Sequence, residues 1–369
     1  MPPVHYREGA FPPDLDWEAL VPYIGPASAA IARYDGILTA IPNPALLLSP
    51  LTTQEAVLSS RIEGTQATMV EVLEFEAGQS PATPGRRDDI HEILNYRKAM
   101  HVAVDSLAAL PLSGRVIREA HAVLLDGVRG QNKAPGELRR TPVWIGPPGC
   151  EIEQASFVPI SAEKLPEAFA CWERYLHAEQ PDRLVQLAVL HAEFEALHPF
   201  LDGNGRLGRM VIPLFLWQTG MIRRPMFYIS GYFEEHREEY YTGLAGVSRD
   251  GDWSAWRRFF LQAAQAQAED NLAKATAILE LYGEMRRRVA GLTRSQYAMN
   301  ALDWIFSQPI FASNYFIERT GIPKPTARRF LAVLREDGVI RTLVPASGRR
   351  APVFAFPALL NIAEGRDVF

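Results

Sequence analysis

The run from His198 to Arg209, HPFLDGNGRLGR, constrains the chain most, because it combines residues that end one helix with residues that begin another. Pro199 prevents simple continuation of the helical pattern before it, and that pattern resumes near Gly205. The glycines at 203 and 205 let a ligand approach the backbone closely, and N–H groups at a helix N-terminus favour anions, phosphate above all. The run therefore predicts an anion-binding loop between two helices.

Charged side chains around this loop indicate polyphosphate chemistry. Arg206 and Arg209 lie three residues apart in the first turns of the second helix, so both can bind phosphates on one side. Asp202 supplies a carboxylate oxygen, which suits Mg²⁺ held mainly by phosphates and water. His198 stands at the other end of the loop, where a neutral imidazole can accept a proton from an incoming hydroxyl. The combination predicts phosphoryl or nucleotidyl transfer.

Two other interpretations of these residues fit less well. The segment 203–208 satisfies the dinucleotide fingerprint G-x-G-x-x-G, but a helical pattern precedes it and Ile222–Arg224 occupies the place of the required acidic residue. His191, Glu195 and His198 share a helical face that could hold a metal, although their spacing is not H-E-x-x-H. Such a face is more often solvated or hydrogen-bonded.

Helical periodicity dominates the chain before residue 288. The β-like insert in the middle has two strand-prone runs, TPVWI and ASFVPI, joined by a turn at Gly146-Pro147-Pro148-Gly149. A helical bundle with one hairpin flap, at about 143–158, is the predicted architecture. We expect a loop at 42–50 and helices at 16–41 with a break at Gly25-Pro26, 52–64 with Thr52 or Thr53 as N-cap, 88–110, 114–125, 162–179, 182–197, 205–219, 233–247 and 253–288.

The pattern changes beyond Leu292. Helix, turn, helix and a basic hairpin follow one another, which is the order of a winged helix-turn-helix domain. The predicted elements are helices at 295–306, 314–319 and 325–337, a turn at Gly321, and strands within 338–344 and 351–356.

This C-terminal part also differs in charge. From residue 286 to 350 there are twelve Lys and Arg against four Asp and Glu, whereas the whole chain carries a net charge of −5. Arg328 and Arg329 on the second helix, and Arg349 and Arg350 in the hairpin, could contact DNA. Protein docking and a merely solvated surface are the alternatives for this region.

Composition is that of an ordinary globular protein. The chain has 369 residues, of which 47% are hydrophobic and 22% charged, so we expect two or three domains. The densest apolar stretch, Met210–Trp217, is far shorter than the ~20 residues of a membrane helix, and the N-terminus lacks a hydrophobic signal core. Cys150 and Cys171 fit a reducing compartment and are too few for a Cys-based zinc site. We therefore expect a cytoplasmic protein.

The residues His198–Arg209 resemble the signature of Fic-domain proteins, HPFx(D/E)GNGRxxR, at every specified position. The segment up to about Thr68 is similar to the N-terminal region of many bacterial Fic domains, and 143–158 is similar to their flap. The resemblance implies a mainly α fold, a Fic-type helical bundle with a β-hairpin flap and a C-terminal winged helix-turn-helix domain. We expect domains at 1–110, 111–290 and 291–369.

The resemblance also implies an activity, the transfer of AMP from ATP to a Ser, Thr or Tyr hydroxyl of a target protein or of the chain itself, with Mg²⁺ as cofactor. His198 would be the general base and Asp202 the Mg²⁺ ligand. The flap would bind the target as an added strand. The nucleotide-binding residues would be Gly203, Asn204 and Gly205 around the α-phosphate, Arg206 and Arg209 at the β- and γ-phosphates, and Tyr241, which with Tyr240 resembles a pair that lines the adenine pocket.

A second resemblance lies outside the signature. Ser59–Gly64, SSRIEG, resembles the inhibitory motif (S/T)xxxE(G/N) of many Fic proteins, whose marked positions fall on Ser59, Glu63 and Gly64. A glutamate that reaches the polyphosphate site can pair with an arginine and repel the tail of ATP. We expect Glu63 to pair with Arg209, and a solvated helix face is the alternative.

Two further functions remain open at this stage. The chain could be a DNA-binding regulator whose Fic core senses nucleotide, or it could remove AMP from a modified protein, with Glu63 positioning a water. The sequence does not name the target, exclude another nucleotide donor or determine the oligomeric state, and a homodimer is compatible with it.

Overall fold

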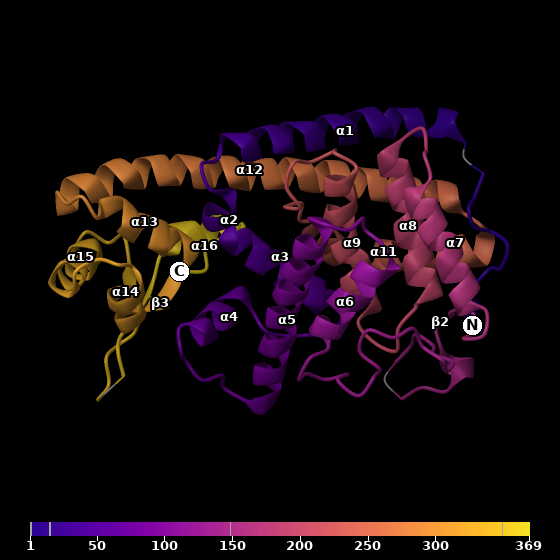
Figure 1. Ribbon diagram of the computed structural model, residues 1–369, viewed down its shortest axis with the longest axis horizontal. Helices are drawn as coiled ribbons and strands as arrows, with labels where there is room; N and C mark the ends of the chain where they lie inside the picture. The colour runs from indigo at the N-terminus through magenta and orange to yellow at the C-terminus, as the bar shows by residue number, and fades with distance from the viewer. Residues whose placement is uncertain (1, 15, 148, 349) are drawn as a thin grey trace. The chain divides into compact units, whose positions relative to one another are not determined.

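The computed structural model describes residues 2–14, 16–147, 149–348 and 350–369, so Pro148 of the predicted flap turn and Arg349 of the predicted DNA contacts lie outside the described residues. The described chain is mainly helical with a few short strands, which confirms the predicted fold class (Figure 1). Apart from residues 1, 15, 148 and 349, the chain divides into two compact units. Unit 1 comprises residues 1–35, 58–64 and 94–269, and unit 2 comprises residues 36–57, 65–93 and 270–369.

Unit 1 is built around α8 (Arg183–Leu197), which is buried on nearly all sides because it is apolar around most of its circumference. It packs against α7 (Leu165–His177), α9 (Asn204–Gln218) and α11 (Arg237–Asp250). The other helices of unit 1 are α6 (Gly114–Leu124), α10 (Ser230–Glu235) and the parts of α1 (Trp17–Ala40), α3 (Ser49–Ile62), α5 (Pro84–Leu107) and α12 (Trp253–Thr293) that fall within its bounds.

The flap, residues 143–158, is less regular than the predicted hairpin. Its first strand-prone run forms a single antiparallel bridge, from Ile145 to Phe157. Its second run contains β2 (Phe157–Val158), which pairs in parallel with β1 (Val4–His5) near the N-terminus. Strand β1 leaves no signal in the sequence, because a strand of two residues has no periodicity to detect.

Unit 2 contains a three-stranded antiparallel sheet in the order β3-β5-β4. Helix α15 (Lys324–Glu336) buries the apolar face that the sequence predicted, Ala327, Phe330, Leu331 and Leu334. The remaining elements of unit 2, besides its parts of α1, α3, α5 and α12, are α2 (Pro44–Leu47), α4 (Met69–Glu76), α13 (Ala298–Ser307), β3 (Ile310–Ala312), α14 (Ser313–Arg319), β4 (Arg341–Val344), β5 (Val353–Ala355) and α16 (Pro357–Glu364).

Three predictions about the N-terminal helices were wrong. Helix α1 continues through Gly25-Pro26 without a break, because packing of its buried residues outweighs the hydrogen bond that a proline removes. Part of the predicted loop at 42–50 is helical, since the Asn43 side chain caps α2. Helix α3 begins at Ser49, so Thr53 lies inside it and donates to the Ser49 carbonyl at 3.2 Å instead of capping the helix.

Within the described residues, no helix combines the length and the apolarity that crossing a membrane requires. The pattern at 233–247 corresponds to two helices, α10 and α11, which meet at His236.

Candidate functional site

The loop between α8 and α9, residues 198–203, takes its shape from its own residues. Helix α8 ends at His198, which has a left-handed backbone with φ 47°, and α9 is preceded by Gly203 with φ 77°. Glycine adopts this region without strain, which explains the residue at 203. The Asn204 side chain accepts from the Phe200 N–H at 2.8 Å and donates to the Phe200 carbonyl at 2.9 Å. Its amide is therefore used to hold the loop, which leaves its backbone for a ligand.

A buried histidine that the sequence analysis missed also holds this loop. Nδ1 of His121 accepts from the Gly136 N–H at 2.7 Å, so Nε2 carries the proton and donates to the Asp202 carbonyl at 3.0 Å. The ring stacks on Phe200 with centroids 3.9 Å apart. Burial lowers the pKa of His121 to about 4, so the ring is neutral at pH 7.

Arg139 is a second missed residue, and it joins the loop to both ends of the flap. Its guanidinium donates to the carbonyls of His198 at 2.8 Å, Leu197 at 3.2 Å and Ile160, and its backbone N–H donates to the Pro199 carbonyl at 2.9 Å. The residue is 2% exposed, and burial lowers its pKa to about 10. These carbonyls are distant in sequence from Arg139, so no local pattern signalled the contact.

At the N-terminus of α9 the predicted acid and cations lie together. Oδ1 of Asp202 accepts from the Gly203 N–H at 2.6 Å and lies 3.4 Å from Nη2 of Arg206. The side chain of Arg206 is 4% exposed and that of Asp202 is 40% exposed, so the carboxylate is open to solvent beside a buried cation. This arrangement can hold an anion and a metal that the anion helps to bind.

Glu63 reaches this same helix terminus from α3. Its Oε1 accepts from Nη2 of Arg209 at 2.7 Å, so the predicted contact between the two residues is present. The carboxylate also lies so close to Gly205 that a side chain at 205 would overlap it. Arg209 is 1% exposed, and it also donates to the hydroxyl and the carbonyl of Ser59 at 2.9 and 2.8 Å. A carboxylate therefore occupies the position where a helix N-terminus would bind phosphate.

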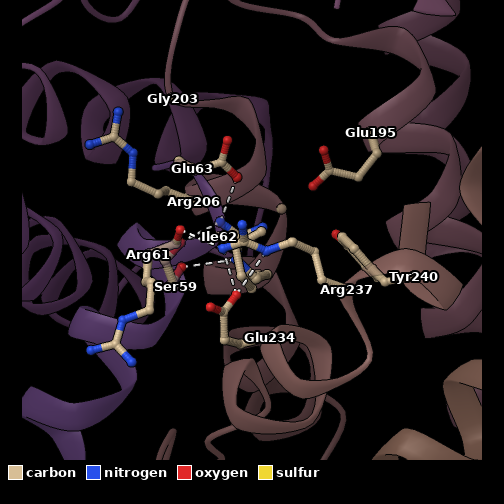
Figure 2. A network of polar contacts seen from close by, with 12 residues as sticks. Ser59, Arg61, Ile62, Glu63, Glu195, Gly203, Arg206, Glu234, Arg237 and Tyr240 are labelled. Carbon is tan, nitrogen blue, oxygen red and sulfur yellow. Dashed lines mark hydrogen bonds and ion pairs between the residues drawn. The ribbon is translucent and has the colours of Figure 1, made fainter. Parts of the chain in front are cut away.

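The C-terminal end of α3 is held by α11, as Figure 2 shows. Nη2 of Arg237 donates to the Arg61 carbonyl at 2.6 Å, and the Tyr241 hydroxyl donates to the Ile62 carbonyl at 3.4 Å. Gly64 follows with φ 103°, and its N–H donates to the Arg61 carbonyl at 2.9 Å. The donors satisfy carbonyls that a helix end leaves without intrahelical partners. They also fix the position from which Glu63 projects.

Burial and charge decide the protonation states in the site. Burial alone would raise the pKa of Glu63, but the Arg209 guanidinium outweighs it and holds the pKa below its usual range. Burial would lower the pKa of Arg209, whereas Glu63 raises it. Burial lowers the pKa of His198 to about 4, although Glu63 opposes this shift. At neutral pH the pair is thus ionised and His198 is a neutral imidazole.

A cavity of about 400 Å³ lies beside the anion site, between the flap, α8 and α11. Tyr241 lines it and is 44% exposed, whereas Tyr240 is buried and does not line it. The two predicted tyrosines therefore have different roles, and only Tyr241 is available to a ligand in this cavity.

The two alternative interpretations of the signature do not fit the structure. His191 uses both ring nitrogens, since Nδ1 donates to the Gly208 carbonyl at 3.2 Å and Nε2 accepts from the Tyr240 hydroxyl at 2.9 Å. Among the described residues no group of three or more His, Cys, Asp or Glu side chains could hold a metal. The glycine-rich segment follows helix α8, where a dinucleotide fingerprint requires a strand.

Known proteins resemble this chain in sequence. The protein adenylyltransferase Fic of Drosophila grimshawi is 29% identical over 215 residues, which are 55% of this chain and 39% of that protein. The chain thus spans about two fifths of the length of this curated relative.

Solved structures resemble it in fold. A Fic family protein from Desulfovibrio desulfuricans G20 has a TM-score of 0.60 at 21% identity, covering 94% of this chain and 98% of that chain. A Fic domain containing signaling protein from Bacteroides thetaiotaomicron has a TM-score of 0.54 at 17% identity, covering 69% and 97%.

Two family models match adjacent segments that together span just over half of the chain. The model of the Fic/DOC family N-terminal region matches residues 21–105, and the Fic/DOC family model matches residues 111–216, which include the signature loop and the anion site. The chain therefore belongs to the Fic/DOC family.

Proposed function

We propose that the protein is an adenylyltransferase that transfers AMP from ATP to a hydroxyl of a protein, and that Glu63 restrains this activity. One observation carries the proposal. The Glu63 carboxylate lies against Gly205 at the N-terminus of α9 and is paired with Arg209 at 2.7 Å, in the place that suits a phosphate. The names of the relatives support the activity, and the contact supports the restraint.

In this mechanism His198 is the general base. Its Nδ1 is buried and has no hydrogen-bond partner among the described residues, so we assign to Nε2 the acceptance of the proton of the target hydroxyl. The hydroxyl oxygen forms a bond to the α-phosphorus of ATP, and the bond from that phosphorus to the bridging oxygen breaks, so pyrophosphate leaves. The negative charge of a bound triphosphate would raise the pKa of His198 from about 4 and make it a better base.

The nucleotide would take up the residues already gathered at α9. The N–H groups of Asn204 and Gly205 would face the α-phosphate, with Gly203 shaping the backbone before them, and Arg206 and Arg209 would bind the β- and γ-phosphates. Both guanidinium groups are buried, which strengthens their attraction for phosphate. In this pose Arg209 exchanges the Glu63 carboxylate for a phosphate.

Asp202 fits the role of Mg²⁺ ligand. Its side chain is 40% exposed and stands next to the phosphate site, which matches a metal held mostly by phosphates and water. When bound there, Mg²⁺ would neutralise phosphate charge.

The base and the target would share the cavity and the flap. The apolar cavity beside Tyr241 suits a purine ring, which can stack on the tyrosine. The outer edge of the flap segment at Trp144 and Gly146 has no backbone hydrogen bond to any described residue, so it is available to an extended peptide of the target.

The test is labelling of protein by α-labelled ATP with Mg²⁺. Glu63→Gly should raise labelling roughly 10- to 100-fold, because a charge-assisted hydrogen bond of ~1.5–3 kcal/mol no longer competes with phosphate. Glu63→Gln, which keeps the shape and removes the charge, should give a smaller rise. The double variant Glu63→Gly/Arg209→Ala should lose the gain.

Unchanged labelling by a folded Glu63→Gly protein would contradict the restraint. Lower labelling, together with loss of AMP removal from a modified protein, would instead favour the reverse reaction, in which Glu63 positions a water. No labelling by any variant would contradict the adenylyltransferase itself.

We further infer that residues 298–355 form a winged helix that binds nucleic acid. The order α13, β3, α14, α15, β4, β5 supports the fold, and exposed Lys324 and Arg328 on α15 support the binding. Arg329 donates to the Thr293 carbonyl at 3.0 Å, so it is a weaker candidate than Arg328. Salt-dependent binding of duplex DNA that Arg328→Ala weakens would support this role, and no binding at low salt would contradict it.

A further inference from the structure

Glu195, in the last turn of α8, has a carboxylate oxygen that the protein does not use. Its Oε1 is buried and has no hydrogen-bond partner among the described residues. Nε2 of His191 is 4.0 Å away and already accepts from the Tyr240 hydroxyl. Gly208 makes room for this carboxylate, since a side chain at 208 would overlap it. A buried acceptor without a partner is costly, so a native structure that keeps one calls for an explanation.

Glu195 lines the cavity of about 400 Å³ between the flap, α8 and α11. The other lining side chains leave little polar capacity, because Ser156 donates to the Ile145 carbonyl at 2.8 Å and the Tyr241 hydroxyl donates to the Ile62 carbonyl at 3.4 Å. Most of the remaining lining residues are apolar, among them Phe157 and Leu244. Both hydroxyl hydrogens of the described lining are therefore used, and Glu195 supplies the carboxyl group that a ligand in the cavity would meet.

The charge state of Glu195 suits an uncharged ligand. Burial raises its pKa to about 8, Arg209 opposes this shift and Glu63 adds to it. At neutral pH most of the population is a neutral acid, which presents a carbonyl acceptor and an O–H donor side by side. A purine base with an amino group beside a ring nitrogen presents the complementary donor and acceptor.

We propose that Glu195 is a specificity-determining residue that hydrogen-bonds the exocyclic amino group of the nucleotide base, and so selects adenine. The inference rests on the proposed function, which places a nucleotide with its phosphates at α9. Glu195 is close to that site, since the position of its carboxylate is limited by Gly208, one turn along α9 from Gly205. A base that enters the apolar cavity must either satisfy this acid or leave it buried and unpaired.

The test compares equilibrium binding of ATP with binding of purine riboside triphosphate, which lacks the amino group. Both are measured by calorimetry on the full chain carrying Glu63→Gly. We expect ATP to bind roughly 10- to 100-fold more tightly, because the analogue leaves the acid unsatisfied. Glu195→Leu should weaken ATP to the level of the analogue without weakening the analogue. Glu195→Gln should keep most of the preference, since an amide also donates and accepts.

Glu193 provides the matched control. It is a second buried glutamate on α8, but its Oε1 accepts from the Tyr6 hydroxyl at 2.6 Å and it does not line the cavity. Glu193→Gln should leave the preference unchanged. The inference would be overturned if the Glu195→Leu protein preferred ATP over purine riboside triphosphate as strongly as its parent protein does. It would also be overturned if Glu195→Leu weakened the binding of both nucleotides by the same factor.

Binding and transfer separate this inference from the proposed function. If the preference depends on Glu195 but no label reaches protein, the adenylyltransferase proposal fails and the base contact stands. If label is transferred but purine riboside triphosphate binds as well as ATP, the base contact fails alone. If neither nucleotide binds, both are overturned.

Discussion

The fold holds the signature loop and the flap very differently. Arg139 and Asn204 each form two hydrogen bonds to the loop at 198–203, His121 forms one, and all three residues are buried. The flap has one bridge, at Ile145, and a two-residue pairing with β1. Rigidity therefore lies where the proton and the phosphate must be placed accurately, and the sparsely bonded segment lies where a partner would add its own hydrogen bonds.

Removal of the general base His198 should have the largest effect, and it tests the signature loop. In the Glu63→Gly protein, His198→Ala should lower transfer from α-labelled ATP by ~10²–10⁴-fold, because no other group takes the hydroxyl proton. Binding of ATP, measured by calorimetry, should change little, since the imidazole acts on the hydroxyl. Labelling close to that of the parent protein would remove His198 from the mechanism.

Arg139→Lys tests whether the signature loop depends on the hydrogen bonds that Arg139 donates to it. Lysine keeps the charge but lacks the planar fork that reaches several carbonyls at once. We expect kcat to fall roughly 10- to 100-fold with little change in KM for ATP, and the free energy of unfolding to fall by about 1–3 kcal/mol. Arg140→Lys is the control, because that side chain is 87% exposed. Equal changes in kcat and KM would point to a general loss of structure instead.

Trp144→Ala tests the sparsely bonded side. The indole is 39% exposed on the flap, and its Nε1 donates to the Cys150 carbonyl at 2.9 Å. Transfer to proteins of a cell extract should fall by about tenfold, since an exposed tryptophan is a common anchor at interfaces. ATP binding should stay the same. If ATP binding falls as much as transfer does, the flap contributes to nucleotide binding and is not a separate target-binding segment.

Acid should lower the stability of the folded protein through the buried histidines around the signature loop, and this is the smallest of the expected effects. The pKa values of His121, His191 and His198 fall to about 4, 3 and 4, below the usual 6.5 of an unfolded chain. Between pH 6.5 and 4 the unfolded state therefore binds protons at these rings that the folded state does not, so their contribution to stability falls as pH falls. Burial raises the pKa values of Glu193 and Glu195 to about 7 and 8, so these two carboxyls oppose part of the loss above pH 4.5. Thermal unfolding should show Tm decreasing over this range by several degrees, and His121→Gln should reduce the slope. An unchanged slope in the His121→Gln protein would contradict neutral burial of this ring.

Local sequence determined the anion loop. Pro199 and Gly203 act within a few residues of where they stand, so the end of α8 and the start of α9 could be predicted closely. The same local reasoning failed at Pro26, where packing elsewhere along α1 overrides what one proline costs. Local rules therefore hold where the backbone conformation itself is the constraint.

Contacts between distant segments required the tertiary structure. The resemblance of Ser59–Gly64 to an inhibitory motif suggested the partner of Arg209, but nothing in a separation of 146 residues predicts contact. Arg139, His121 and Glu195 had no motif to identify their roles. Two of them bind backbone carbonyls, which every residue has, and the third has a carboxylate oxygen without a hydrogen-bond partner among the described residues. The sequence by itself thus determined which residues can bind phosphate, and only the fold decided which groups position them, because a backbone carbonyl or an empty cavity leaves no pattern of residue types.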